Sequence, residues 1–424
     1  MASVDEDANA EVEAVAPTRT DSDAETLPEA EMVREQGPES TPEAPRPTVP
    51  LESGEALQLH ESVGPVPLCA GGDAEPVVLD WFGARRADLL VSAGGGPKGR
   101  CAWIFRQLES AGDGAPLYAE GEAVAGLDGV RCLCPLPNGG ESRFDLVALA
   151  ADGLVYLPNV GTADAPRFEE RRPLGFPASL GLGTGRIAQM IADDWDGDGL
   201  TDLLIGFDDL EGYWPAEDAA LPSSQWVGFN QRGGHPGYDR RGHWRGQPPR
   251  GRLVWMRNVG APSAPRFEAP ASIESETGRV AVGLHPAPLA VAWGASRTLE
   301  FLLTDATGQV RLYRNFGGQR PPVLMEPRPI RLDGKPLRLP DDRTTLTAAD
   351  VDGDGKQELV FGGADGRVFA IHPGTGRDEA RTPALLLSRD RTLRFGGHTV
   401  VAAGDLDGDG DLDLVAGDGP GRLF

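Results

Sequence analysis

The amino-acid sequence predicts an all-β protein built from a repeated unit of four short strands. Three observations support this fold class. Short apolar runs, each preceded by an acidic residue, recur along the chain. An aromatic strand that ends in Asn-x-Gly follows several of these runs. The runs are rich in β-branched residues, are bounded by Gly and Asp, and lack the period of an amphipathic helix.

The repeat is measured from the acidic residue before each apolar run, which we call the anchor. The anchors are Asp88, Asp145, Asp202, Glu300, Glu358 and Asp413. Successive anchors are 57, 57, 98, 58 and 55 residues apart. The Asn-x-Gly markers begin at Asn159, Asn258 and Asn315, and the next anchor follows each after 43, 42 and 43 residues. The long gap of 98 residues therefore holds an insertion near 207–250 instead of another repeat.

Four strands in about 57 residues correspond to one blade of a β-propeller. The last repeat reaches Phe424 inside its third strand, and residues 56–60 have the spacing of its missing outer strand. Pairing N- and C-terminal strands would leave the ring without an open edge. We therefore predict a six-bladed β-propeller over residues 53–424, closed by this pairing, with seven blades as the alternative.

Charge and composition limit the partners. The chain has 65 acidic and 40 basic residues and a formal net charge of −25, which argues against nucleic acid, because its binding needs a basic surface. No run of 18 apolar residues predicts a membrane span. Residues 1–52 are acidic, contain no aromatic residue and few apolar ones, and are predicted to be a disordered tail or linker. We expect a monomer.

Three loops repeat the same acidic pattern, at residues 194–202, 350–358 and 405–413. Carboxylates stand at positions 1, 3, 5 and 9, with Gly at positions 4 and 6. Ca²⁺ prefers six to eight oxygen ligands, so the pattern predicts about three calcium ions. An EF-hand is excluded, since its position 12 requires Glu and these loops have Ile205, Phe361 and Ala416. The alternative is a set of Asp-Gly turns that only join strands. The predicted ligands are Asp194, Asp196, Asp198, Asp202, Asp350, Asp352, Asp354, Glu358, Asp405, Asp407, Asp409 and Asp413.

These D-x-D-G-D-G-x-x-D loops resemble those of the FG-GAP/VCBS repeat family, which includes the propeller of integrin alpha subunits. The resemblance extends over residues 80–424 and implies calcium in the loop between the first two strands of a blade. It also implies adhesion or surface recognition, in an extracellular or cell-surface location. No signal peptide is visible, so a cytoplasmic location stays open. Residues 80–88 have Arg85 and Arg86 in place of the middle carboxylates, so this loop is expected to be metal-free.

The insertion at 207–250 adds aromatic and basic residues to an acidic protein. Antiparallel connectivity places it on the face opposite the acidic loops, and exposed aromatics with Arg could bind a sugar or an acidic partner. The alternative is a lid whose aromatics form their own small core. The candidate ligand face comprises Trp214, Trp226, His235, Tyr238, Arg241, His243, Trp244 and Arg245.

The leading functional prediction is a non-enzymatic, calcium-stabilised binding scaffold for a protein or carbohydrate ligand. The sequence has no G-x-S-x-G, H-E-x-x-H or P-loop motif. The alternative is a carbohydrate-active lyase or hydrolase that uses His, Tyr and Arg of the insertion. A third possibility is a structural module that presents its acidic tail.

Overall fold

The computed structural model divides the chain into two compact units, Met1–Ala44 and Pro45–Phe424. All described residues belong to the second unit. They are residues 48–51, 58–59, 66–68, 70–96, 99–108, 116–138, 144–150, 153–162, 165–175, 186–210, 213, 238–239, 241, 243–280, 282–293, 300–315, 323–339, 345–376, 378–381, 384–388, 391–392, 395–410 and 412–424.

Six principal sheets, numbered here in chain order, contain most of the strands. The strands given below for each sheet pair with their neighbours in antiparallel fashion and follow the order of the chain. The first sheet consists of β4 (Glu75–Leu79), β5 (Asp88–Gly96), β6 (Gly99–Phe105) and β8 (Glu122–Ala123). The second consists of β9 (Arg131–Pro137), β10 (Phe144–Ala150), β11 (Gly153–Leu157) and β12 (Arg172–Pro173). The third consists of β13 (Arg186–Asp193), β14 (Asp202–Asp209), β15 (Arg250–Met256) and β16 (Ala271–Ser272).

The remaining principal sheets have the same order. The fourth consists of β19 (Ala287–Val291), β20 (Glu300–Thr304), β21 (Arg311–Tyr313) and β22 (Arg328–Pro329). The fifth contains β25 (Leu346–Ala349), β26 (Glu358–Gly362), β27 (Val368–Ile371) and β29 (Ala384–Ser388), and the sixth contains β31 (Val400–Gly404) and β32 (Asp413–Gly417). Shorter strands are β1 (Thr48–Leu51), β2 (Gln58–Leu59), β3 (Val66–Pro67), β7 (Leu117–Tyr118), β17 (Glu274–Ser275), β18 (Gly278–Arg279), β23 (Arg331–Leu332), β24 (Lys335–Pro336), β28 (Glu379–Ala380) and β30 (Arg391–Thr392).

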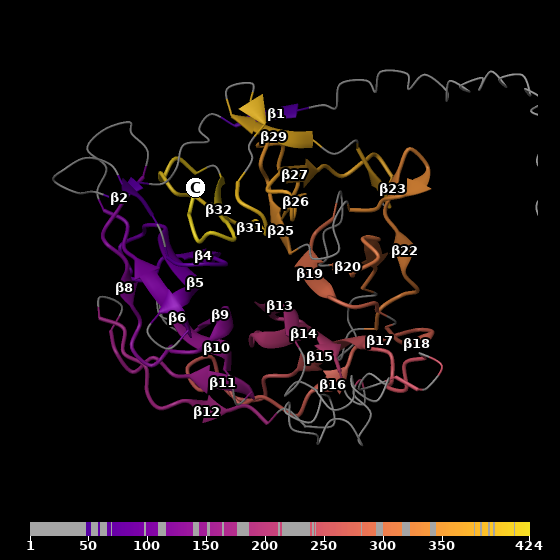
Figure 1. Ribbon diagram of the computed structural model, residues 1–424, viewed down its shortest axis with the longest axis horizontal. Helices are drawn as coiled ribbons and strands as arrows, with labels where there is room; N and C mark the ends of the chain where they lie inside the picture. The colour runs from indigo at the N-terminus through magenta and orange to yellow at the C-terminus, as the bar shows by residue number, and fades with distance from the viewer. Residues whose placement is uncertain are drawn as a thin grey trace, which may run out of the picture. The chain divides into compact units, whose positions relative to one another are not determined.

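The first strands of successive sheets lie beside one another. β9 contacts β13, β13 contacts β19, β19 contacts β25, β25 contacts β31, and β31 contacts β4. Figure 1 shows the sheets of this unit as spokes around a common centre. This arrangement is that of a β-propeller, and the all-β prediction is confirmed. None of the described residues forms a helix with the length and apolar character needed to cross a bilayer.

Each anchor lies at the start of the second strand of its sheet. Five anchors are the first residue of that strand, and Asp145 is the second residue of β10. The aromatic strands predicted after them are the third strands, such as β11 and β15. β14 and β15 pair as far as Asp209 and Arg250, so the insertion connects these two strands at the end opposite residues 194–202.

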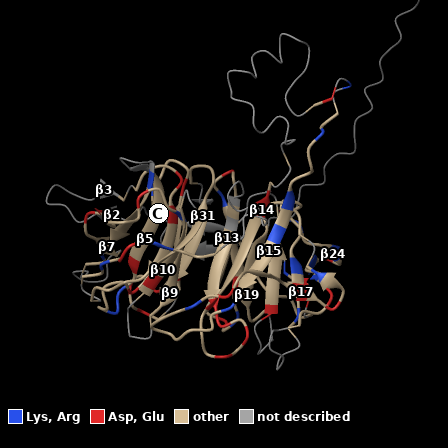
Figure 2. Ribbon diagram, turned by 90° about the horizontal axis from the view of Figure 1, so that it is seen from below, with Lys and Arg blue, Asp and Glu red and all other residues tan. Residues whose placement is uncertain are grey.

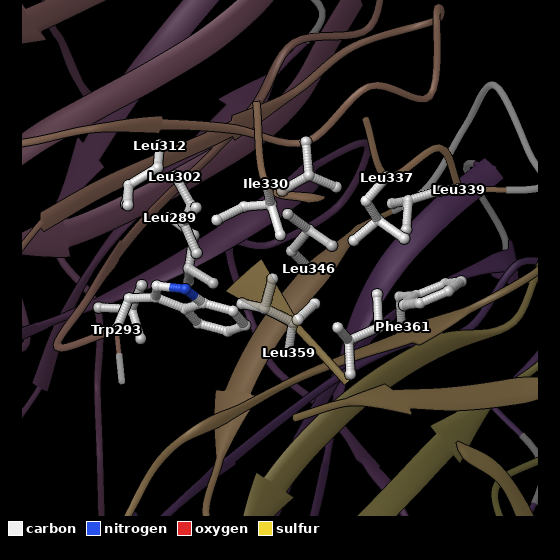
Figure 3. Close-up of a cluster of buried hydrophobic side chains, with 14 of the residues drawn as sticks. Leu289, Trp293, Leu302, Leu312, Ile330, Leu337, Leu339, Leu346, Leu359 and Phe361 are labelled. Atoms are coloured by element: carbon white, nitrogen blue, oxygen red, sulfur yellow. The ribbon is translucent and has the colours of Figure 1, made fainter. Parts of the chain in front are cut away.

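Apolar side chains fill the space between neighbouring sheets. In the cluster of Figure 3, Leu289, Trp293, Leu302 and Leu312 of the fourth sheet region face Leu346, Leu359 and Phe361 of the fifth. Trp293 is 2% exposed and Leu302 and Leu359 are fully buried. Burial of one such side chain stabilises the fold by about 1.5–3 kcal/mol. The rigid frame that positions the loops therefore results from packing between sheets.

Residues shortly before β4 meet the C-terminal residues at the edge of the sixth sheet. The Leu423 amide donates to the Leu68 carbonyl at 3.1 Å, and the Ala70 amide donates to the Gly421 carbonyl at 3.0 Å. Leu423 also forms a bridge with Gly417 of β32. Leu68 and Ala70 thus lie beside residues 421–423, which lie beside β32.

The placement of residues 56–60 at this edge was wrong. Gln58 and Leu59 form β2, which pairs with β3 and, in parallel, with β7 of the first sheet region. Residues 68–70 take the C-terminal edge instead, because they lead directly into β4, which packs beside β31. Of the predicted tail at 1–52, residues 48–51 form β1, which pairs in parallel with β29, and the rest lies outside the described residues.

Candidate metal centres

The three acidic loops each join the first strand of a sheet to the second. The first acidic loop (194–202) connects β13 to β14, the second (350–358) connects β25 to β26, and the third (405–413) connects β31 to β32. The last residue of the first strand pairs with the anchor in each case, as Asp193 does with Asp202. The loops therefore occupy the same place in three sheets. Figure 2 shows Asp and Glu in red in loops at the strand ends.

The two glycines of each loop adopt a left-handed backbone. Gly197 and Gly199 have φ values of 69° and 88°. Their counterparts, also at positive φ, are Gly353, Gly355, Gly408 and Gly410. Residues with a Cβ rarely adopt this conformation, which explains why glycine stands at positions 4 and 6. The resulting tight turn brings the intervening carboxylates together.

The aspartate at position 1 organises each loop through the backbone. Asp194 accepts hydrogen bonds from the amides of Asp198 and Gly199, both at 2.9 Å. Asp350 accepts from the amides of Asp354 and Gly355 at 3.1 and 2.8 Å. Asp405 accepts from the amides of Gly408 and Gly410 at 2.7 and 3.1 Å. The bond from the position-6 amide to the position-1 carboxylate is therefore common to all three loops, whereas the second bond comes from position 5 in the first two loops and from position 4 in the third.

Three carboxylates converge in each loop. Their oxygens lie within 4.8 Å of one another in the groups Asp194–Asp196–Asp198, Asp350–Asp352–Asp354 and Asp405–Asp407–Asp413. Calcium–oxygen distances are about 2.3–2.6 Å, so oxygens on opposite sides of one ion are about 4.8 Å apart. These donor sets therefore fit Ca²⁺. Among the predicted ligands, Asp202, Glu358 and Asp409 are not part of these three groups.

The anchor at position 9 also has a structural contact. The Asp202 side chain is fully buried, burial raises its pKa to about 6, and its Oδ1 accepts a hydrogen bond from the Asn258 amide at 2.7 Å. Asp88 and Asp145 make the same bond to the third strand of their sheets, with the amides of Gln107 and Asn159 at 2.8 Å. The anchor therefore ties the second strand to the end of the third, whether or not the sheet has an acidic loop.

Basic residues distinguish the first two loops. In the first, one guanidinium nitrogen of Arg257 lies 2.7 Å from Asp196 Oδ2 and 3.1 Å from Asp198 Oδ2. In the second, His372 Nδ1 lies 3.3 Å from Asp352 Oδ2 and 3.4 Å from Glu358 Oε1.

The position-9 carboxyl of the second loop has a further partner. The Glu358 carboxylate accepts a hydrogen bond from the Val351 amide at 3.0 Å. The nearby Glu358 carboxylate, opposed by burial, raises the pKa of His372. In the third loop, Asp405, Asp407 and Asp413 form no ion pair with a basic residue of the described part of the chain. The three loops thus differ in how their charge is balanced.

Residues 80–88 of the first sheet keep the turn without the carboxylate cluster. Asp80 accepts hydrogen bonds from the amides of Ala84 and Arg85 at 3.0 and 3.1 Å, as position 1 does in the acidic loops. Asp88 accepts from the Phe82 amide at 3.0 Å. The absence of metal from this loop remains a prediction.

The described part of the insertion contains a small aromatic cluster. Trp244 lies between Tyr213 and Tyr238, with ring centroids 4.8 and 5.1 Å away. Tyr238 is 47% exposed, whereas Trp244 is half-buried. Arg241, His243 and Arg245 are exposed, and Trp214, Trp226 and His235 lie outside the described residues. The insertion combines the internal packing of a lid with an exposed tyrosine.

A cavity that the sequence did not reveal lies among the first strands. Its volume is about 950 Å³, and its lining includes Arg100, His285 and His398. His285 Nδ1 lies 2.8 Å from Asp208 Oδ2, and Arg100 lies 3.0 Å from Glu75. His285 and His398 have φ values of 53° and 60°, a strained conformation that is enriched at functional sites. Both histidines lie outside the repeated motif, so the repeat pattern alone did not identify them.

Comparisons with known proteins support the repeat. Residues 350–416 match the family model of the FG-GAP-like repeat, which includes the whole of the second and third acidic loops. The resemblance to this repeat family is therefore confirmed. No curated protein matches the sequence.

Similar solved structures have low sequence identity. They include an Agrocybe aegerita lectin that recognises non-reducing terminal N-acetylglucosamine, at 14% identity, covering 84% of this chain and 80% of that chain, with a TM-score of 0.44. Another is a Penicillium chrysogenum alpha-L-arabinanase complexed with arabinobiose, at 12% identity, covering 85% and 97%, with a TM-score of 0.45. The Dos1 propeller is similar at 11% identity, covering 87% and 80%, with a TM-score of 0.34. At these scores the similarities carry no functional argument.

Proposed function

We propose that this protein is a calcium-stabilised β-propeller that serves as a non-enzymatic binding scaffold for a protein or carbohydrate ligand. The observation that carries the proposal is the set of three acidic loops at the same position in their sheets, each with a hydrogen bond from the position-6 amide to the position-1 aspartate. Three equivalent sites on a frame favour a structural role for the ion, whereas a catalytic centre would be expected once. The extracellular or cell-surface location belongs to the same proposal, because extracellular calcium can fill weak sites.

The proposed propeller has six blades, one for each principal sheet, and is closed at the sixth. The support is the contact of β31 with β4 and the hydrogen bonds between residues 68–70 and 421–423. In this arrangement residues 68–70 supply the outer strand of the sixth blade. Closure of this kind removes an open edge that would otherwise pair with other chains.

The proposed ligand face is the insertion between β14 and β15. Tyr238 presents an exposed ring beside Trp244, and Arg241 and Arg245 add positive charge. An aromatic face can stack on a sugar ring, and arginine can pair with an acidic group. Because the acidic loops lie at the other end of the strands, a ligand bound at the insertion would not block the calcium sites.

One observation favours the enzyme alternative, a carbohydrate-active lyase or hydrolase. His285 lines the cavity and contacts Asp208 at the end of β14, where the insertion begins. Screening of polysaccharides for turnover separates the two functions. Turnover that Tyr238→Phe or His235→Ala abolishes, in a variant that melts like wild type, would replace the scaffold by the enzyme.

Metal removal tests whether Ca²⁺ stabilises the folded protein. Protein freed of metal, with its metal content checked by elemental analysis, is expected to melt at a lower temperature than protein with Ca²⁺. A ligand that binds only the folded state stabilises it by about 2.7 kcal/mol at 100 times its Kd. Re-addition of Ca²⁺ should restore the original melting temperature. Identical melting curves with and without Ca²⁺ would reject structural calcium.

A further inference from the structure

The fifth sheet brings a histidine to the second acidic loop. Asp352 lies within the loop, Glu358 begins β26, and His372 directly follows β27. One ligand atom from each lies within 4.8 Å of the other two. The Glu358 and His372 side chains are 1% and 10% exposed, while Asp352, at 29%, borders solvent. The cluster is therefore enclosed on two sides and accessible from the third.

One carboxylate oxygen of this cluster lacks a hydrogen-bond partner among the described residues. Glu358 Oε2 accepts the Val351 amide, but Glu358 Oε1 is buried and accepts no hydrogen bond from the described residues. A buried carboxylate oxygen without a partner is costly. His372 Nδ1 is nearly equidistant from Glu358 Oε1 and Asp352 Oδ2, at 3.4 and 3.3 Å. A single N–H can point well at only one of two oxygens, and charge-assisted bonds are about 2.7–2.9 Å long.

The same distances match the edges of a metal coordination sphere. Zinc binds His nitrogen at about 2.0–2.1 Å and carboxylate oxygen at about 2.0–2.2 Å, so two ligands of a tetrahedral ion lie about 3.4 Å apart. The donor set is one imidazole nitrogen and two carboxylate oxygens. Imidazole suits Zn²⁺ and other transition metals, whereas Ca²⁺ takes oxygen ligands. The cluster therefore differs in chemistry from the all-carboxylate groups of the three acidic loops.

We propose that Asp352, Glu358 and His372 form a binding site for a transition-metal dication, with Zn²⁺ as its representative. The three side chains supply three ligands, and the exposed side at Asp352 leaves a position for water. The site shares Asp352 with the carboxylate group of the second acidic loop, so Zn²⁺ and Ca²⁺ compete there. It does not depend on calcium in the first or third acidic loop.

The test measures Zn²⁺ and Ca²⁺ binding to the full-length protein by calorimetry, after metal removal. Two variants separate the sites: His372→Gln removes only the nitrogen ligand, and Asp354→Asn removes a carboxylate that belongs only to the all-carboxylate group. Wild type is expected to bind one Zn²⁺ that His372→Gln weakens at least about tenfold, since even indirect changes at metal sites cost about 10–100-fold. Asp354→Asn should weaken one Ca²⁺ and leave Zn²⁺ affinity unchanged. Co²⁺ bound at this site should show visible absorption that is lost in His372→Gln.

Each outcome bears on the proposal separately from the calcium sites. The proposed site is overturned if wild type and His372→Gln bind Zn²⁺ with equal affinity. It is also overturned if Asp354→Asn weakens Zn²⁺ binding as much as His372→Gln does. Absence of Zn²⁺ binding also overturns it and leaves a protonated His372 between the two carboxylates as the resident cation. Loss of all calcium binding with retained Zn²⁺ binding would reject the proposed function and not this site. Matching melting curves of the metal-free variants and wild type confirm that the variants are folded.

Discussion

Arg257 and His372 occupy the same position in their sheets, and each contacts the position-3 aspartate of an acidic loop. Each follows the residue that pairs with the position after the anchor, Met256 opposite Leu203 and Ile371 opposite Leu359. Arg257 contacts Asp196, and His372 contacts Asp352. One position directly after the third strand therefore places a basic side chain against the neighbouring acidic loop in both sheets.

Replacement of Arg257 by Met should strengthen calcium binding in the first acidic loop. The guanidinium neutralises Asp196 and Asp198 and competes with an ion for them. Removal of these charge-assisted hydrogen bonds should raise the affinity of one Ca²⁺ several-fold and lower the stability of the metal-free protein. Calorimetric titration measures the first effect and thermal melting the second.

The matched control is Arg314→Met. Arg314 follows Tyr313, which pairs with Phe301, so it has the equivalent position in the fourth sheet, where no acidic loop precedes β20. Calcium affinities should not change in this variant. If Arg257→Met and Arg314→Met alter calcium binding equally, Arg257 does not compete for the first loop.

Asp145→Asn should destabilise the protein by about 1–3 kcal/mol with or without calcium. The Asp145 side chain is buried and accepts hydrogen bonds from the Asn138 side chain at 2.7 Å and the Asn159 amide at 2.8 Å. Both of these bonds end on Oδ1, and Oδ2 accepts a third from the Tyr156 hydroxyl at 2.5 Å. The amide nitrogen of Asn in place of Oδ2 cannot accept that bond. Asp413→Asn, at the equivalent position after an acidic loop, should lose more stability in calcium than in chelator. Chemical unfolding in both conditions measures the difference, and a calcium-dependent effect of Asp145→Asn would contradict a purely structural anchor.

Gly421→Ala should disrupt the contact between the two ends of the unit. Gly421 has a φ of 90°, and a Cβ there would lie 1.6 Å from the Gly71 carbonyl oxygen. Gly334→Ala is the control for backbone strain alone, since Gly334 has a φ of 74° and a Cβ there would meet nothing within 4 Å. Gly421→Ala should lower the melting temperature clearly more than Gly334→Ala. Equal shifts would show that the contact at Gly71 adds nothing to stability.

Asp418→Asn should lower the free energy of unfolding at neutral pH. Acid should lower the free energy of unfolding of the wild type by protonating the same carboxylate. Burial opposes ionisation of Asp418, but hydrogen bonds from Arg422 and the Gly396 amide outweigh it and lower its pKa. A lowered folded-state pKa gives stability that is full above the unfolded value of about 3.9 and is lost as pH falls through the folded value. The difference in unfolding free energy between wild type and Asp418→Asn should therefore shrink below about pH 4.

The control for this pH effect is Asp365→Asn. Asp365 forms an exposed pair with Arg367, and exposed pairs contribute about 0–1 kcal/mol. Its substitution should change the unfolding free energy little at any pH. A gap between wild type and Asp418→Asn that persists undiminished well below pH 3 would count against an ionised Asp418 as the source of stability.

The sequence predicted the features that repeat. Anchor spacing located the second strand of every principal sheet, and the position of the acidic loops followed from the same alignment. The loop pattern placed glycines at positions 4 and 6, where the structure shows a left-handed backbone. These inferences needed only local spacing.

Contacts between distant parts of the chain were beyond such reasoning. Arg257 reaches Asp196 only because of the register between the second and third strands, which a linear pattern does not specify. The cavity at His285 and His398 is lined by strands from several sheets, so no segment carries its signature. Residues 56–60 were assigned to the wrong edge because spacing alone could not distinguish them from residues 68–70.

The hydrogen bond from Leu423 to Leu68 joins residues that are more than 350 positions apart. Each sheet between them can form from neighbouring segments, but this joint requires nearly the whole folded unit to be synthesised first. Contacts of such high sequence separation form late and slowly. During translation, Leu68 and Ala70 should therefore remain unpaired until the C-terminal residues have been synthesised. We expect chaperone binding or incorrect strand pairing to occur at this joint.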